Sequence, residues 1–278
     1  MIPASFDYVR AKSLRDALNA IGTDGTKVLA GGHSLIPAMK LRLAQPRLLV
    51  DIGRLEALRT VEARDGRLVI GALVTHAEIA ASQMLAMRCP LLAETAAAIG
   101  DLQVRNKGTI GGSLVHADPA ADWPAAILAL DAELEIAGAE GRRTVPARDF
   151  FAGMFDTAVR PHEILCAIRV PEGAAASAYV KTDQKASGFA LCGVAAVVDA
   201  AARRVRVGIT GVAPVAYRAT GVEKALEGQA LDAEAIAAAA GQAASGVAAL
   251  NDIHASAAYR AHLAEVNTAR ALARAASR

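Results

Sequence analysis

AGGHSLIP at residues 30–37 predicts a loop that joins a strand to a helix. The apolar run 27–30 precedes it as a short strand, and Ser34 stands where it can cap a helix that holds Pro37 in its first turn. A second glycine stretch, TIGGSL, follows at residues 109–114. A Gly-Gly step lets backbone N–H groups approach a pyrophosphate closely, because no Cβ stands in the way. One such stretch is equally well explained by a tight turn. Two together predict a site that holds a dinucleotide from both sides.

Capping and turn signals predict further elements before residue 172. Ser13 can cap a helix, Thr75 and Glu78 form a capping box, and Pro171 stops a strand. The predicted elements are helices at 14–21, from 75 to before Pro90, and at 91–99, strands at 48–52 and 164–170, and hairpins around Asp65-Gly66 and Glu140-Gly141.

The segment 172–177, EGAAAS, predicts a domain boundary because it is small, polar-edged and follows a proline. Beyond it the pattern indicates three strands, at 177–182, 189–198 and 205–211. Alanine-rich helices are expected around 222–226, 232–244 and 257–275.

Composition excludes several classes of protein. A chain of 278 residues with 54% hydrophobic and 21% charged residues is globular and long enough for two domains. The formal charge of +2 and the scattered basic residues argue against a nucleic-acid partner, and no apolar run is long enough for a membrane span. Cys89, Cys166 and Cys192 are too widely spaced for a disulfide framework or a metal cluster. Buried reduced thiols and a cytoplasmic enzyme are expected.

Several polar residues admit two interpretations. His33 is either a loop histidine satisfied by the backbone or a catalytic group, although no nucleophile or metal partner stands near it. His116, Asp118 and Asp122 lie close together, but their spacing suits turn and cap roles better than metal ligation. A ribose or ribityl hydroxyl is a better partner for Asp122 than a metal ion.

The second half of the chain holds three more candidates. Lys181 and Lys185 are either solvated on a strand or neutralise a phosphate. Phe189 either packs in the core or stacks on a flat ring. The residues alone leave these alternatives open.

Four motifs in order carry a resemblance to a known family. They are AGGHSLIPAMKLRL at 30–43, TIGGS at 109–113, DPxxDWP at 118–124 and ASxxYRxxL at 255–263, and the chain opens with IPxSFDY. Together they resemble the FAD-binding medium subunit of the molybdenum hydroxylases, the carbon monoxide dehydrogenase and xanthine dehydrogenase family, over essentially the whole chain. The resemblance implies an α+β fold: a vanillyl-alcohol-oxidase (PCMH)-type FAD-binding domain at 1–176, with two α/β lobes at about 1–56 and 57–176, and a small domain of antiparallel strands and helices at 177–278.

The resemblance also implies the cofactor site. Asp122 would hydrogen-bond the FAD, Leu165 would line its pocket, Lys181 would lie near it, and Phe189 would stack on the isoalloxazine. Two stretches would wrap the pyrophosphate and ribityl chain: Leu29, Ala30, Gly31, Gly32, His33, Ser34 and Leu35, and then Thr109, Ile110, Gly111, Gly112 and Ser113. The chain departs from the family in having Ser113 where Asn is usual and Phe189 where the most similar relatives often have Tyr. No metal site and no acid–base residue is implied in this chain.

The implied function is electron relay within a heterotrimer. A large molybdenum-cofactor subunit would oxidise the substrate, a small subunit with two two-iron two-sulfur clusters would pass electrons singly, and FAD on this chain would release them to an acceptor. The expected assembly is a dimer of heterotrimers. Two alternatives are a stand-alone FAD-dependent oxidase, which would need its own substrate domain, and a non-enzymatic nucleotide-binding protein. A Rossmann dehydrogenase is disfavoured because neither glycine stretch contains GxGxxG.

Overall fold

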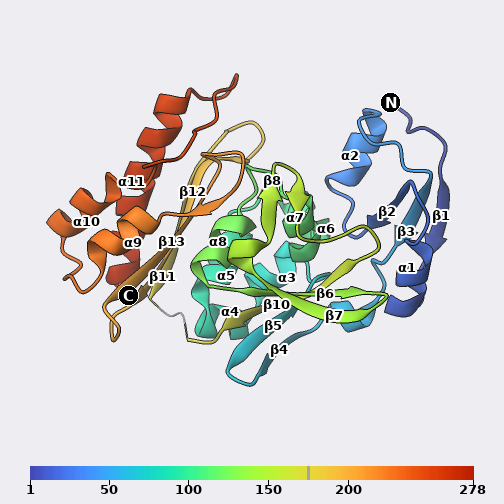
Figure 1. Cartoon of the computed structure of the whole chain (residues 1–278), viewed down its shortest axis with the longest axis horizontal. Helices are drawn as coiled ribbons and strands as arrows, with labels where there is room; N and C mark the ends of the chain where they lie inside the picture. Colours follow the sequence, from blue (N-terminus) through green and yellow to red (C-terminus); the bar gives the residue numbers. More distant parts are fainter. Residues whose placement is uncertain (174–175) are drawn as a thin grey trace.

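The computed structural model describes residues 1–173 and 176–278, over which helices accompany three larger sheets and one two-stranded hairpin (Figure 1). The predicted boundary at 172–177 includes residues 174 and 175, which lie outside the described ranges. Among the described helices, none is long and apolar enough to cross a membrane.

The first sheet is parallel, with the order β1-β3-β2. Parallel neighbours need crossover connections, and helices supply them here. The hydroxyl of Ser13 accepts the amide of Asp16 at 3.0 Å, which caps the first helix as predicted. The elements are β1 (Asp7–Arg10), α1 (Leu14–Ala20), β2 (Thr26–Leu29), α2 (Leu35–Lys40), β3 (Leu48–Asp51) and the 3-10 helix η1 (Glu56–Leu58).

The second sheet is antiparallel, with the order β4-β5-β10-β6-β7. Both predicted hairpins are confirmed in it. Asp65 and Gly66 take φ values of 54° and 71°, as a tight two-residue hairpin turn requires. The strands are β4 (Val61–Arg64), β5 (Arg67–Gly71), β6 (Glu133–Gly138), β7 (Gly141–Pro146) and β10 (Ile164–Pro171), and the 3-10 helix η2 (Ala147–Asp149) and the hairpin β8 (Phe151–Gly153) and β9 (Asp156–Thr157) precede β10.

A layer of helices packs on this sheet. Two predictions for its helices are wrong. The helix expected from residue 75 to Pro90 is divided at Ser82, whose extended backbone ends α3 and whose hydroxyl caps α4. The stretch TIGGS is not a loop, because Thr109 caps a helix that begins at Ile110. The capping box of Thr75 and Glu78 is confirmed. The helices are α3 (His76–Ala81), α4 (Gln83–Arg88), α5 (Pro90–Ala97), α6 (Leu102–Lys107), α7 (Ile110–His116) and α8 (Trp123–Ala129).

The third sheet is antiparallel, with the order β11-β12-β13-β14. The three predicted strands are present, but the short fourth strand β14 was not expected, and α10 ends at Ala240 rather than at residue 244. The elements are β11 (Ser177–Asp183), β12 (Ala190–Asp199), β13 (Arg204–Thr210), β14 (Tyr217–Arg218), α9 (Thr220–Leu226), α10 (Ala233–Ala240) and α11 (Ala257–Ala276).

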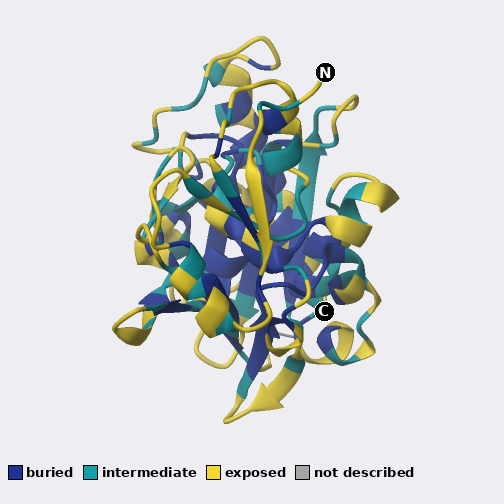
Figure 2. Cartoon of the chain, turned by 90° about the vertical axis from the view of Figure 1, so that its right-hand side faces the viewer, coloured by how far each residue is buried: buried dark blue, intermediate teal, exposed yellow. Residues whose placement is uncertain are grey.

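Helices α5 and α8 lie between the second and third sheets, while α11 covers the other face of the third sheet (Figure 1). The largest hydrophobic core extends across the second and third sheets rather than lying within one of them. It joins strands β5, β6 and β10, the middle helices and residues such as Tyr179 and Ala195 from the third sheet. Figure 2 shows the buried segments gathered in the interior with exposed segments around them. The helix layer between the two sheets therefore packs against side chains from both of them.

Candidate functional site

A cavity of about 610 Å³ opens where β2 and its following loop meet α6, α7 and the start of α8. Its volume is in the range of small-molecule and cofactor sites. All of the predicted cofactor-binding residues line it except Ile110 and Lys181. The lining predicted residues are Leu29, Ala30, Gly31, Gly32, His33, Ser34, Leu35, Thr109, Gly111, Gly112, Ser113, Asp122, Leu165 and Phe189. The fold thus brings together segments that lie far apart in the sequence.

The first glycine loop offers unused backbone donors. The amides of residues 31–34 donate to no acceptor among the residues that the structure describes. Gly32 has a φ of +78°, which favours glycine. Glycine is required at position 31 for a different reason, because a Cβ there would overlap the carbonyl of Lys107. The close packing of two chain segments therefore requires Gly31, whether or not a ligand is bound.

Two side chains of this loop are now placed. Ser34 occupies the N-cap position of α2, as predicted, but its side chain makes no cap hydrogen bond. His33 Nε2 lies 3.2 Å from the carbonyl oxygen of Gln103, which agrees with a loop histidine satisfied by the backbone. No acid–base role follows for His33 from this contact.

The second glycine stretch differs from the first, because its amides are already used. The Ile110 amide donates to the carbonyl of Val74 at 3.0 Å, and the Gly111 amide donates to that of Ala72 at 2.9 Å. Gly112 donates to the Thr109 hydroxyl at 3.1 Å. The expectation that both glycine steps present free N–H groups is therefore wrong here. This stretch offers the hydroxyls of Thr109 and Ser113 instead.

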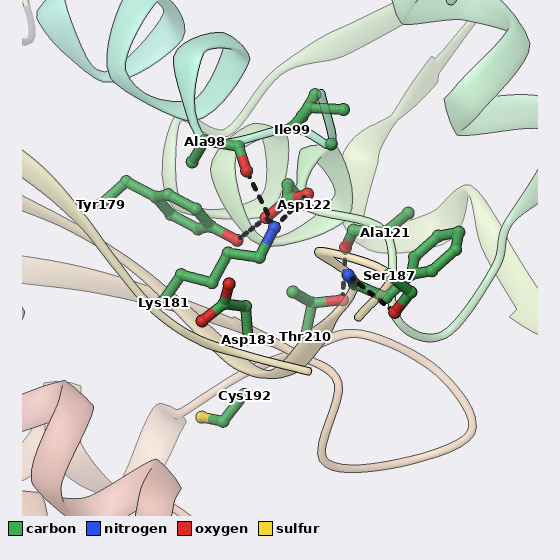
Figure 3. A network of polar contacts seen from close by, with 12 residues as sticks. Ala98, Ile99, Ala121, Asp122, Tyr179, Lys181, Asp183, Ser187, Cys192 and Thr210 are labelled. Atoms are coloured by element: carbon green, nitrogen blue, oxygen red, sulfur yellow. Dashed lines mark hydrogen bonds and ion pairs between the residues drawn. The ribbon is translucent and has the colours of Figure 1, made fainter. Parts of the chain in front are cut away.

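Asp122, which lines the cavity, belongs to a buried polar network (Figure 3). Its Oδ1 accepts the Tyr179 hydroxyl at 2.6 Å and lies 2.8 Å from Lys181 Nζ, and its Oδ2 lies 3.0 Å from the same ammonium. Lys181 also donates to the carbonyl of Ala98 at 2.9 Å. The solvated interpretation of Lys181 is therefore wrong, whereas Lys185 is exposed and pairs with Asp183 at 2.9 Å.

The electrostatics of this network follow from burial. Burial raises the pKa of Asp122, and the neighbouring Lys181 ammonium opposes that rise. Burial and the Asp122 carboxylate together raise the pKa of Tyr179 well above its usual value. Because the charges of Lys181 and Asp122 compensate each other, Lys181 adds no free positive charge to the cavity. Tyr179 was missed by the sequence analysis, although it stands two residues before Lys181 and so shares its strand face.

Phe189 stands at the rim of the cavity, just before β12 begins at Ala190. It is 50% exposed, so core packing is the wrong interpretation. The loop before it is held by Gln184, whose Oε1 accepts the amides of Ala186 and Ser187 at 2.7 and 2.8 Å. The aromatic ring is thus presented by a braced loop.

The remaining candidates have structural roles. Asp118 Oδ1 accepts the Ala120 amide at 2.8 Å, as expected for a turn, and the described residues include no group of three or more side chains able to hold a metal ion. Cys89, Cys166 and Cys192 are buried and unpaired, as predicted. Burial raises the pKa of Cys89 and Cys192 to about 12 and that of Cys166 to about 11.

His76 is a further cavity residue that the sequence analysis missed. Its Nδ1 lies 3.1 Å from Trp123 Nε1, which joins the start of α3 to the start of α8. Burial lowers the pKa of His76 to about 4, aided by the charges of His33 and Arg105. The imidazole is neutral at pH 7 for that reason.

Comparison with known proteins defines the class of this fold and cavity. Residues 4–173 match the family described as the FAD binding domain in molybdopterin dehydrogenase. Residues 177–275 match the CO dehydrogenase flavoprotein C-terminal domain. The carbon monoxide dehydrogenase medium chain of Hydrogenophaga pseudoflava is 40% identical over 279 residues, which cover 98% of this chain and 97% of that protein. The 6-hydroxypseudooxynicotine dehydrogenase complex subunit alpha of Paenarthrobacter nicotinovorans is 36% identical, with 100% and 97% covered.

Solved structures agree. The carbon monoxide dehydrogenase of H. pseudoflava superposes with a TM-score of 0.96 at 41% identity, covering 100% of this chain and 99% of that chain. The quinoline 2-oxidoreductase of Pseudomonas putida 86 gives a TM-score of 0.94 at 31% identity, with the same coverage. This chain belongs to the family of FAD-binding medium subunits of the molybdenum hydroxylases. The predicted family and α+β fold class are confirmed.

Proposed function

We propose that this chain holds FAD in the cavity and relays electrons from a partner subunit through it to an external acceptor. The observation that carries the proposal is the set of four unused amides at residues 31–34, on the wall of a cavity whose rim presents Phe189. Backbone N–H groups without a protein acceptor fit the negative charge of a pyrophosphate, and an exposed aromatic ring fits a flat heterocycle. The residues present therefore fit the cofactor that the family implies.

Different groups of this chain bind different parts of FAD. The amides of residues 31–34 bind the pyrophosphate, the hydroxyls of Thr109 and Ser113 bind the ribityl chain, and Leu165 and Phe189 bury the ring. A carboxylate can accept about four hydrogen bonds. Tyr179 and Lys181 make three contacts with Asp122, and the Asp122 backbone adds a further hydrogen bond, so the protein itself satisfies most of this carboxylate. Bound FAD supplies the redox chemistry, and the protein supplies orientation, exclusion of water and local charge.

The partners in this proposal are those of the family. A large subunit with the molybdenum cofactor oxidises the substrate, and a small subunit with two two-iron two-sulfur clusters delivers electrons to this chain. We further propose a dimer of heterotrimers located in the cytoplasm. The medium-chain relatives and the solved carbon monoxide dehydrogenases support a multi-subunit assembly of this kind.

We propose that the FAD-binding domain spans 1–176, with lobes at about 1–56 and 57–176, and that the C-terminal domain spans 177–278. The change from the second sheet to the third between β10 and β11 supports this division. So do the two family matches, which end at residue 173 and begin at residue 177.

Cofactor extraction from the assembled complex tests the proposal. The expected result is one FAD per copy of this chain, with loss of FAD in Gly32→Val because the branched side chain obstructs the loop. Gly66→Val is the matched control: Gly66 has a similar φ of +71°, but its Cβ would meet nothing within 4 Å. Recovery of FMN, NAD or no flavin from a folded complex contradicts the proposal, and so does equal FAD loss in both variants.

A further inference from the structure

His76 is held in one tautomer by Trp123. An indole N–H can only donate, so the 3.1 Å contact between Trp123 Nε1 and His76 Nδ1 makes Nδ1 the acceptor. In a neutral imidazole the proton must then lie on Nε2. Both residues are at most 4% exposed, so water does not compete for the contact.

The other edge of the imidazole has no protein partner. Nε2 finds no acceptor among the described residues, and it does not belong to the fully enclosed unpaired atoms. Since His76 lines the cavity, its Nε2–H is open to that space alone. Water can satisfy this donor in the open cavity, and a ligand that displaces the water must offer an acceptor in its place.

Glycine at position 108 makes room for this edge. A Cβ there would lie 2.7 Å from His76 Nε2, closer than side chains tolerate. Gly108 in turn packs against Gly31, because a Cβ on Gly31 would lie 3.1 Å from the Gly108 Cα. The unpaired N–H therefore lies next to the loop whose amides are also unused.

We propose that His76 is a further cofactor-binding residue, whose Nε2–H is aimed by Trp123 and donates to an acceptor oxygen of the flavin nucleotide. This inference rests on the proposed binding of FAD in the cavity. Trp123 is the positioning residue, because it fixes the tautomer without reaching the ligand itself. Burial disfavours protonation of His76, aided by His33 and Arg105, so the imidazole acts as a neutral donor.

Two amide substitutions separate the two edges of the ring. In His76→Asn the short side chain keeps an acceptor near Nδ1 for Trp123 but removes the cavity donor. In His76→Gln the longer side chain places an N–H near Nε2 but removes the acceptor for Trp123. The FAD dissociation constant of the full chain, assembled with its partner subunits, should rise about tenfold for Asn, or about 1.4 kcal/mol, and recover most of this loss for Gln.

The thermal stability of the two variants is the second readout. We expect His76→Asn to be more stable than His76→Gln, because only Asn keeps the acceptor for Trp123, and this order is opposite to the order of FAD affinity. If His76 had only a structural role, the less stable His76→Gln would also bind FAD more weakly than His76→Asn. That result overturns the inference. Nitrogen-15 NMR of histidine in the FAD-loaded wild type should show the Nε2-protonated tautomer, and a proton on Nδ1 also overturns it. A wild-type complex that binds no FAD would instead refute the proposed function.

Discussion

Lys181→Met should strongly destabilise the protein, because it leaves a buried carboxylate with one partner fewer. The side chains of Lys181 and Asp122 are only 9% and 5% exposed. Removing one member of a buried ion pair costs about 3–5 kcal/mol. Tyr179 still donates to Asp122, so we expect about 3 kcal/mol, the lower end of that range.

The cost should also depend on pH. Lys181 lowers the pKa of Asp122 against the raising effect of burial, so its removal raises the folded-state pKa further. A carboxylate whose pKa is higher in the folded state loses stability as the pH rises from its unfolded value of about 4. The deficit of Lys181→Met relative to wild type should therefore be larger at pH 8 than at pH 5.

Urea unfolding of the full chain at both pH values measures this effect. Lys185→Met is the matched control, since the Lys185 side chain is 90% exposed and its ion pair should contribute less than about 1 kcal/mol. Adding Asp122→Asn to Lys181→Met should cost less than the sum of the single variants, because the two residues interact directly. Equal deficits for Lys181→Met and Lys185→Met, or no change with pH, would refute the reasoning.

Two further predictions concern the flavin. Phe189→Ala should weaken FAD binding by about tenfold, since a stacked aromatic contributes roughly 0.5–1.5 kcal/mol beyond its buried area, whereas Phe189→Tyr should bind FAD like wild type. Titration of the apo complex with FAD measures both affinities. An unchanged affinity in Phe189→Ala rejects the stacking role. The isolated chain should turn over no substrate and should release FAD faster than the assembled complex, because partner contacts stabilise the binding-competent state; equal release rates in a flavin-fluorescence assay would count against this.

Local signals in the sequence predicted much of the fold. The caps at Ser13 and Thr75 and the turn at Asp65-Gly66 are confirmed because each depends on residues no more than four positions apart. The family was also recognisable, since its motifs are contiguous short stretches. These features need no knowledge of which segments meet in space.

The helical start at TIGGS shows where local reasoning failed. Its two glycines suggested a loop with free amides, yet carbonyls of Ala72 and Val74 accept two of those amides. A Cβ at Gly111 would also lie 2.5 Å from the Ala72 side chain. Helix packing, rather than ligand approach, is therefore the nearest reason for that glycine.

The chemistry of the cavity was decided by tertiary structure alone. Tyr179 and Lys181 reach Asp122 across 57 and 59 residues of sequence, and Trp123 reaches His76 across 47. Whether a lysine is solvated or paired depends on the burial of its strand, which composition does not reveal. The sequence by itself thus determined the family, many of the helices and strands, and the positions of the glycine stretches. Only the tertiary structure decided which polar groups are satisfied by the protein and which are left for a ligand, because hydrogen-bond partners are set by proximity in space.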